Sequence, residues 1–234
     1  MLTNAFSPES WAVALDILKT EFLKGLGETL YITLLSTVFA SVIGLPLGVL
    51  LAAGGKDGFI RLPRVLWRAL DVIVNILRSV PFLILMIMVI PLTRAIIGTA
   101  VGTTATIIPL VIAAFPFVAR LFETSLREVS PALIETAQSL GASPAQIVFK
   151  VLLPEAVPGL VNNFTIALTT ILGYSAMSGM IGGGGIGKIA INYGYYRYQF
   201  LVMLFAVIVL VALVQIFQSL GTRIAKKLDR RNRG

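Results

Sequence analysis

The sequence contains no cysteine and no histidine. The absence of cysteine excludes disulfide bridges and thiol nucleophiles, and the absence of both residues excludes zinc sites of the usual Cys/His type. A Ser-His-Asp triad is excluded as well, because its general base is missing. We therefore expect no catalytic residue and no metal site, and we do not expect the chain to be an enzyme.

Charge is also scarce. Charged residues make up 13% of the chain and hydrophobic residues 57%, whereas ordinary soluble domains are about 25% charged. A soluble fold of 234 residues could not easily bury this much apolar surface, so lipid is the expected solvent. The first fifteen residues contain no lysine or arginine, so we expect no cleavable signal peptide.

Five segments are long and apolar enough to cross a membrane as helices, which takes about 20 residues each. They are residues 29–55, 72–93, 95–119, 156–187 and 198–222, and only the second contains a charge, Arg78. The second and third are joined so closely, around Arg94, that we expect a hairpin. The predicted fold class is an all-α membrane protein with five transmembrane helices and a cytoplasmic insert between the third and fourth.

The positions of lysine and arginine predict the orientation of these spans. By the positive-inside rule, the side with more basic residues is cytoplasmic. That side carries Lys56, Arg61, Arg64, Arg68, Arg120, Arg127, Lys150, Arg223, Lys226, Lys227, Arg230, Arg231 and Arg233. The other side carries Lys19, Lys24, Arg94, Lys188 and Arg197. With five spans, the N-terminus is expected outside and the C-terminus in the cytoplasm.

Three regions follow from this topology. Residues 1–28 form an extracytoplasmic or interfacial segment, residues 25–222 the transmembrane domain, and residues 223–234 a basic cytoplasmic tail. Ser7-Pro8 is typical of a helix start, and the helix after it either lies in the outer interface or extends the first span. We interpret the tail as a topology anchor attracted to anionic lipid. No nucleic-acid-binding module accompanies it.

The insert between spans three and four is half-polar and interrupted by glycine and proline. Ser130-Pro131 predicts the start of a short helix and Gly141 its end, because a left-handed residue is favoured there. Ser143-Pro144 predicts a second helix, which Pro154 is expected to close. Leu133, Ala137 and Leu140 share one face of the first helix. The residues alone leave two interpretations open: a linker at the membrane interface, or a surface that docks a soluble partner.

The same insert resembles the "EAA" signature of the type I ABC importer permeases. The signature reads E-A-A, three residues, G, nine residues, I, one residue, L-P. This chain has Glu135-Thr136-Ala137, then Gly141, then Val151, Leu152, Leu153 and Pro154, at matching spacing. Residues 75–94 (NILRSVPFLILMIMVIPLTR) and 173–198 (GYSAMSGMIGGGGIGKIAINYGYYRY) resemble the methionine-uptake branch of that family.

The resemblance implies a homodimer of this permease, bound to two copies of a separate ATPase and served by an extracytoplasmic methionine-binding protein. ATP would bind the ATPase, and this chain would hold no cofactor. Residues 131–140 would be a coupling helix seated on the ATPase, with Gly141 as its turn. Glu135 would be its polar anchor and Ala137 would allow close approach, with Thr136 and Leu140 beside them. Transport would proceed by alternating access.

The translocation path is less clear from the sequence. The polar residues Asn163, Tyr174 and Ser178 lie in the fourth span, where they either line the path or bond neighbouring helices. Gly183 and Gly184 belong to the run GGGGIG, which formally fits G-x-G-x-x-G. A dinucleotide site is rejected, because no strand precedes the run and no acidic residue follows about 20 positions on. The run is interpreted as a flexible or closely packed turn, or as a gate.

Three functions are therefore compared. The first is the permease of an ATP-driven methionine importer in the bacterial plasma membrane. The second is a related permease for another small amino acid or solute. The third is a membrane enzyme or a self-sufficient channel, which is disfavoured because no constellation of acids, bases or metal ligands lies in the spans. The P-loop pattern G-x-x-x-x-G-K-[ST] is absent, as expected if a partner hydrolyses ATP.

Overall fold

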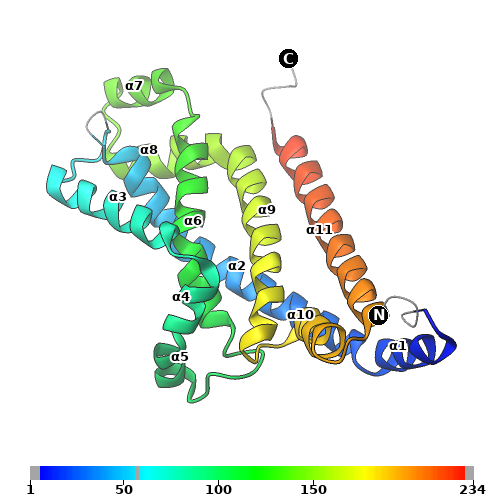
Figure 1. Cartoon of the computed structure of the whole chain (residues 1–234). Coiled ribbons are helices and arrows are strands. Elements are labelled where there is room, and N and C mark those ends of the chain that lie inside the picture. Colours follow the sequence, from blue (N-terminus) through cyan, green and yellow to red (C-terminus); the bar gives the residue numbers. More distant parts are fainter. Residues whose placement is uncertain (1–5, 56–57, 230–234) are drawn as a thin grey trace. The chain divides into compact units, whose positions relative to one another are not determined.

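The computed structural model describes residues 6–55 and 58–229, and these residues form helices and loops without a strand (Figure 1). The basic residues Lys56, Arg230, Arg231 and Arg233 lie outside this part of the chain. The α-helices are α1 (Pro8–Thr20), α2 (Phe22–Ala53), α3 (Arg64–Ser79), α4 (Phe82–Met88), α5 (Ile90–Ile97), α6 (Ile107–Arg127), α7 (Pro131–Ser139), α8 (Pro144–Ile147), α9 (Leu153–Met177), α10 (Gly185–Ile189) and α11 (Phe200–Leu228). The predicted all-helical class is confirmed.

Four helices in the described part are long and apolar enough to cross a membrane. They are Phe22–Ala53, Ile107–Arg127, Pro144–Ile181 and Phe200–Leu228. The third of them joins α8, a π-helical turn at Val148–Leu152, α9 and a 3₁₀ turn at Ser178–Ile181. A fifth span results if α3 and α4 are counted as one broken helix.

The expected hairpin around Arg94 is wrong. Arg94 lies inside α5, and the connection to α6 is the loop of residues 98–106, which contains Gly98 and Gly102 at positive φ. The expected second span is also broken, between α3 and α4. Val80 is extended there, with ψ 127°, because the ring of Pro81 disfavours the helical conformation of the preceding residue.

Pro154 does not close the second helix of the insert, contrary to expectation. The chain continues helically from α8 through the π turn into α9, and the backbone N–H of Leu153 bonds to the carbonyl of Val148. This wider i→i+5 pattern shifts the hydrogen-bond register just before Pro154, where a regular α-helix would lose a bond and clash with the ring. Proline is therefore accommodated within the span.

At the other end of the chain, α1 is a helix separate from α2. The Ser7 side chain accepts a hydrogen bond from the Ser10 N–H at 3.2 Å, which caps the start of α1 as the sequence predicts. Glu21 ends the helix, so α1 is not an uninterrupted extension of the first span. Ala14 and Ile17 pack against Ile186, Leu201 and other buried residues of α10 and α11.

The chain divides into two compact units. Unit 1 comprises Met1–Thr37, Pro81–Ile112 and Leu168–Phe217, and unit 2 comprises Val38–Val80, Ala113–Ala167 and Gln218–Gly234. The helices α2, α6, α9 and α11 contribute to both. A core cluster in unit 2 connects α2, α6, the π turn and α9. Its buried members are Val49, Leu126, Val129, Val148, Leu152 and Ala156.

Two glycines one turn apart, Gly44 and Gly48, bring α2 and α6 into close contact within unit 2. A Cβ atom on Gly44 would lie 3.0 Å from a methyl of Val118, and one on Gly48 would lie 2.9 Å from the carbonyl oxygen of Ala119. This is the small-xxx-small arrangement by which membrane helices approach each other. It allows the backbone of α2 to lie directly against α6.

We predict that Gly48→Val lowers the free energy of unfolding by about 1–3 kcal/mol, because the added methyl groups would have to displace the α6 backbone. Thermal unfolding of the solubilised chain, followed by circular dichroism, measures the change. Gly27→Ala is the control in the same helix, since nothing lies within 4 Å of its Cβ position. Equal midpoints for Gly48→Val and the wild type would contradict the prediction.

Candidate functional site

The insert helix α7 is held to unit 2 by very little buried surface. None of its residues is buried, and Ile134 is the residue that packs against the core cluster of α2, α6 and α9. The Leu133–Ala137–Leu140 face predicted from the sequence does not face the core, since Leu133 and Leu140 are exposed. The contact to the core is made instead by Ile134, the residue after Leu133. Figure 1 shows α7 beyond the end of α6, next to α8.

Gly141 ends α7 as predicted. Its φ is +78°, the left-handed conformation that glycine adopts without a Cβ penalty. The N–H of Gly141 bonds to the carbonyl of Gln138 at 2.9 Å, and the N–H of Ala142 bonds to that of Ala137 at 3.0 Å. These two bonds form a Schellman motif. Because nothing lies within 4 Å of its Cβ position, Gly141 is required by conformation and not by space.

The other signature residues divide into an exposed group and a buried group. Glu135, Thr136 and Leu140 are exposed, and Ala137 is half-buried. The hydroxyl of Thr136 donates to the carbonyl of Ala132 at 2.7 Å, so it serves the helix itself. Leu153, at the far end of the signature, packs against the core cluster, and its neighbour Leu152 is buried in that cluster. The second half of the signature thus anchors the insert, and the first half lies at the surface.

The second helix of the insert starts with a complete capping box. The Ser143 side chain accepts from the N–H of Gln146 at 3.3 Å, and the Gln146 side chain accepts from the N–H of Ser143 at 2.8 Å. Both bonds satisfy amide groups that a helix start would otherwise leave free. The cap fixes where α8 begins, and hence where the chain returns to the core at Ile147.

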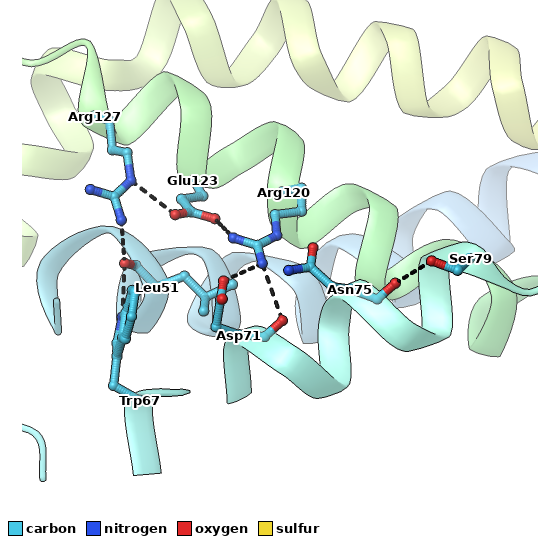
Figure 2. Close-up of polar contacts among 8 residues, drawn as sticks. All are labelled: Leu51, Trp67, Asp71, Asn75, Ser79, Arg120, Glu123 and Arg127. Carbon is cyan, nitrogen blue, oxygen red and sulfur yellow. Dashed lines mark hydrogen bonds and ion pairs between the residues drawn. The ribbon is translucent and has the colours of Figure 1, made fainter. Parts of the chain in front are cut away.

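Beneath the insert, a network of charged side chains joins α3, α6 and the end of α2 (Figure 2). Arg120 forms an ion pair with Asp71 of α3 and donates to the Glu123 carboxylate at 2.6 Å. The other oxygen of Glu123 accepts from Nε of Arg127 at 2.9 Å. The carboxylate of Glu123 is buried, so its two arginine partners offset the cost of removing it from water.

The network ends on a backbone carbonyl, that of Leu51. This oxygen accepts from Nη2 of Arg127 at 2.8 Å and from Nε1 of Trp67 at 3.2 Å. Leu51 lies in the last turn of α2, where carbonyl groups have no partner within the helix. A cation at this end also interacts favourably with the helix dipole. Arg127 and Trp67 thus tie α6 and α3 to the same point on α2.

Sequence reasoning missed this network, because it uses Arg120 and Arg127 only as cytoplasmic charges and assigns no partner to Asp71. Arg78 is exposed, whereas Asp71 pairs with Arg120. The usable signal was the spacing of these three charges. Glu123 is three residues after Arg120 and four before Arg127, so both pairs of opposite charge share one helical face. The pairing with α3 had no such signal.

Among the residues considered for a translocation path, Asn163 bonds α9 to α6. Its side-chain amide donates to the carbonyl of Leu121 at 2.7 Å and to the hydroxyl of Ser125 at 2.6 Å. Tyr174, by contrast, stacks on Phe82 with ring centroids 4.1 Å apart and planes 8° from parallel. Both rings of this pair are half-buried.

Ser178, Gly183 and Gly184 form a tightly packed turn in unit 1. The backbone N–H of Gly183 bonds to the carbonyl of Ser178 at 2.9 Å. A Cβ atom on Gly183 would lie 2.5 Å from the Ser178 hydroxyl, and one on Gly184 would lie 2.7 Å from the Glu28 carboxylate. Because glycine has no Cβ atom, the chain can pack this closely against Ser178 and Glu28. Of the interpretations offered by the sequence, this supports a closely packed turn.

The first turn of α10, which follows these glycines, is held by side chains of α2. The N–H of Gly185 donates to Glu28 at 2.8 Å, and the N–H of Ile186 donates to the hydroxyl of Thr29 at 2.8 Å. Both are free amides of a helix start. No group of three or more acidic side chains that could hold a metal ion occurs in the described ranges.

Comparison with known proteins identifies the family. A model described as "binding-protein-dependent transport system inner membrane component" matches residues 44–233. A curated relative from Vibrio cholerae, named probable D-methionine transport system permease protein MetI, is 51% identical over 205 residues, which cover 87% of this chain and 90% of the relative. The D-methionine transport system permease protein MetI of Escherichia coli K12 is 52% identical over 156 residues, covering 67% and 71%.

A solved structure supports the same assignment. It is described as an inward-facing conformation of the MetNI methionine ABC transporter. Its matching chain is 48% identical with a TM-score of 0.87, over 89% of this chain and 96% of that one. The protein therefore belongs to the family of binding-protein-dependent transport system inner membrane components. It is a membrane transport component and not an enzyme, as the sequence predicted.

We predict that Asp71→Asn lowers the free energy of unfolding by about 1–3 kcal/mol, because it leaves the Arg120 guanidinium with a weaker partner in a largely buried place. The unfolding midpoint of the solubilised chain reports the change. Asp16→Asn, in an exposed turn of α1, is the control. If Asp71→Asn costs as much stability in an Arg120→Gln background as in the wild type, the pair itself is not responsible.

Proposed function

We propose that this chain is the membrane-spanning permease of an ATP-driven importer that moves methionine, as one or both enantiomers, across the plasma membrane. The observation that carries the proposal is 51% identity over 205 residues to a relative named as a D-methionine transport permease. A match that covers 205 of the 234 residues includes both the insert and the glycine-rich turn. The TM-score of 0.87 to a methionine transporter adds structural support.

The functional assembly proposed here contains two copies of this chain, two copies of a separate ATPase and an extracytoplasmic methionine-binding protein. The family description, which refers to binding-protein-dependent transport, supports the last of these partners. The name of the structural relative, an ABC transporter, supports the ATPase. ATP would bind that subunit, and the permease would contribute the path.

The proposed orientation places the N-terminus outside and the C-terminus in the cytoplasm. Basic residues at the end of α11, Arg223, Lys226 and Lys227, support this orientation. Arg61, Arg64 and Arg68 at the start of α3 support the same side. The insert helix α7 would then face the cytoplasm, where the ATPase is.

We assign α7 the role of a coupling helix because of how it is exposed. Leu133, Glu135 and Leu140 lie on its surface, while Ile134 attaches it to the core. Such a short helix is marginal in isolation, so a partner surface would stabilise it. An ATPase groove would accept the two leucines and bond to the Glu135 carboxylate, and Ala137 would let the two backbones approach.

The charged network gives a route by which movement of α7 would reach the spans. α7 follows directly on α6, and α6 is bonded to α3 through Arg120 and to α2 through Arg127. Displacement of α7 would therefore move three helices of unit 2 together rather than bend one of them. Closure of the ATPase pair would rock this group and expose the path alternately to the two sides.

For the path itself, we propose contributions from Asn163, Tyr174, Ser178, Gly183 and Gly184. Tyr174 is supported by its half-exposed stack on Phe82, since aromatic rings make favourable contacts with a thioether sulfur. Asn163 and Ser178 would keep α9 in register beside the path. Gly183 and Gly184 would hold the closely packed turn that acts as a gate.

We predict that Gly141→Val reduces methionine uptake per ATP hydrolysed while leaving membrane insertion unchanged. A β-branched residue opposes the left-handed conformation, at a cost of about 1–2 kcal/mol, but creates no clash. Gly141→Asn is the matched control, because asparagine tolerates this conformation. Uptake and ATP hydrolysis in proteoliposomes containing the whole complex measure the coupling ratio. Wild-type coupling in the valine variant would contradict the role of α7.

Glu135→Ala provides a second test of the same role that does not alter the backbone. Its side chain is exposed, so the variant should fold and unfold like the wild type. Loss of the proposed anchor should weaken retention of the ATPase during purification. Full retention together with full coupling would remove Glu135 from the interface.

The substrate is tested by competition. Proteoliposomes with the complete transporter and its binding protein should accumulate labelled methionine. Unlabelled D- or L-methionine should suppress that signal at concentrations where glutamine, leucine and arginine do not. Accumulation of another amino acid in preference to methionine would support a permease for a different small solute instead.

A further inference from the structure

A hollow of about 450 Å³ opens in unit 2 between the end of α2 and the start of α3. Three arginines and a tryptophan line it, together with the glycines of the connecting loop. The lining includes Arg61, Arg64, Arg68, Trp67, Gly54 and Gly55. The three arginines indicate the cytoplasmic side of the membrane, and the indole N–H of Trp67 bonds to Leu51.

The indole of Trp67 forms a fixed wall of this hollow. Its N–H bond to the Leu51 carbonyl, at 3.2 Å, sets the ring orientation. Cβ atoms on Gly54 and Gly55 would lie 3.2 and 3.7 Å from ring atoms, so the ring is packed against the loop backbone. A tryptophan with one apolar face and a bonded N–H is typical of the boundary between lipid tails and headgroups.

The arginines bring positive charge that no ion pair of the described residues neutralises. All three are exposed. The ion pairs found within residues 6–55 and 58–229 involve Asp71, Arg120, Glu123 and Arg127, and none involves an arginine of the hollow. Guanidinium groups bind phosphate oxygens in bidentate fashion and do so better than ammonium groups. The hollow therefore suits a phosphate-bearing anion.

An apolar stripe on α3 begins beside these arginines. Val65, Val72 and Ile76 lie on one face of the helix and are 82%, 51% and 59% exposed. Trp67 and Asp71 are on the opposite face, where α3 meets α2 and α6. Arg68 and Val72 are one turn apart, so a ligand held by the arginines would extend directly along the stripe.

We propose that this surface binds an anionic phospholipid, with its phosphate held by Arg61, Arg64 and Arg68 and its acyl chains lying along Val65, Val72 and Ile76. A lipid supplies both an anionic head and apolar tails, so it satisfies the hollow and the stripe together. A soluble phosphate would leave the stripe uncovered. The site would fix the start of α3 against the bilayer, about one turn before Asp71, where the charged network joins this helix to α6.

The two tryptophans of the chain allow a direct test. Trp11→Phe retains a ring beside Phe205 and leaves Trp67 as the single fluorophore. The full-length variant is reconstituted in vesicles of phosphatidylcholine with phosphatidylglycerol, and the acyl chains of one lipid or the other are brominated to quench Trp67 on contact. Each arginine near a membrane surface favours anionic lipid by about fivefold. We expect at least that preference for phosphatidylglycerol around Trp67.

Three variants of the Trp11→Phe chain test whether the arginines cause the preference for phosphatidylglycerol. Replacing Arg61, Arg64 and Arg68 with glutamine should reduce it to about onefold, because no described residue of the lining then carries a positive charge. Replacing them with lysine should retain most of it, which separates charge from folding. Arg78→Gln, on the same helix but outside the hollow, should leave it unchanged. An unaltered preference in the glutamine variant would overturn the proposal.

Further measurements on the Trp11→Phe chain need no change to the arginines. Raising the ionic strength should weaken the preference, since exposed charges are screened. Loss of the preference on binding the ATPase would assign the arginines to that protein and overturn the lipid site. Relief of quenching by glycerol phosphate at constant ionic strength would indicate a site for soluble anions, and would also overturn it.

Discussion

The guanidinium group of Arg120 holds together the part of the molecule on which the insert depends. It bonds to the carboxylates of Asp71 and Glu123 at once, and Glu123 in turn engages Arg127. Asp71, Arg120 and Glu123 are largely withdrawn from water, so each would be costly if it were unpaired. Alternating signs within one network offset that cost, so α3 and α6 are joined at a defined register.

This network is possible only because α2 lies so close to α6. Gly48 faces the backbone at Ala119 and Glu123, and a larger residue there would push the helices apart. The end of α2 would then move away, and the Leu51 carbonyl would leave the reach of Arg127, now at 2.8 Å. The small residues thus let α2 approach α6, and the charged side chains then fix the position of one helix against the other.

The insert itself contrasts with the network below it. Its helix is capped at Gly141 by backbone bonds and attached through Ile134, while its outer face carries Leu133 and Leu140 in the open. A rigid base and a lightly held helix suit an element that binds a partner and transmits its movement. The proposed lipid site lies on the same base, where α3 begins. Partner and bilayer would then act on one group of helices.

What the sequence determined by itself was local. The length of the apolar runs indicated membrane helices, and the glycine at 141 and the Ser-Pro pairs indicated where the insert helices start and stop, because chain conformation at these points depends on neighbouring residues. The signature around Glu135 indicated the family, because it too is a pattern of residues at fixed spacing along the chain. Only the tertiary structure decided the π turn that carries the chain through Pro154, the break at Val80, and the pairing of Asp71 with Arg120. Those features depend on which helices pack together and at what register, and residues 49 positions apart carry no local pattern that reveals it.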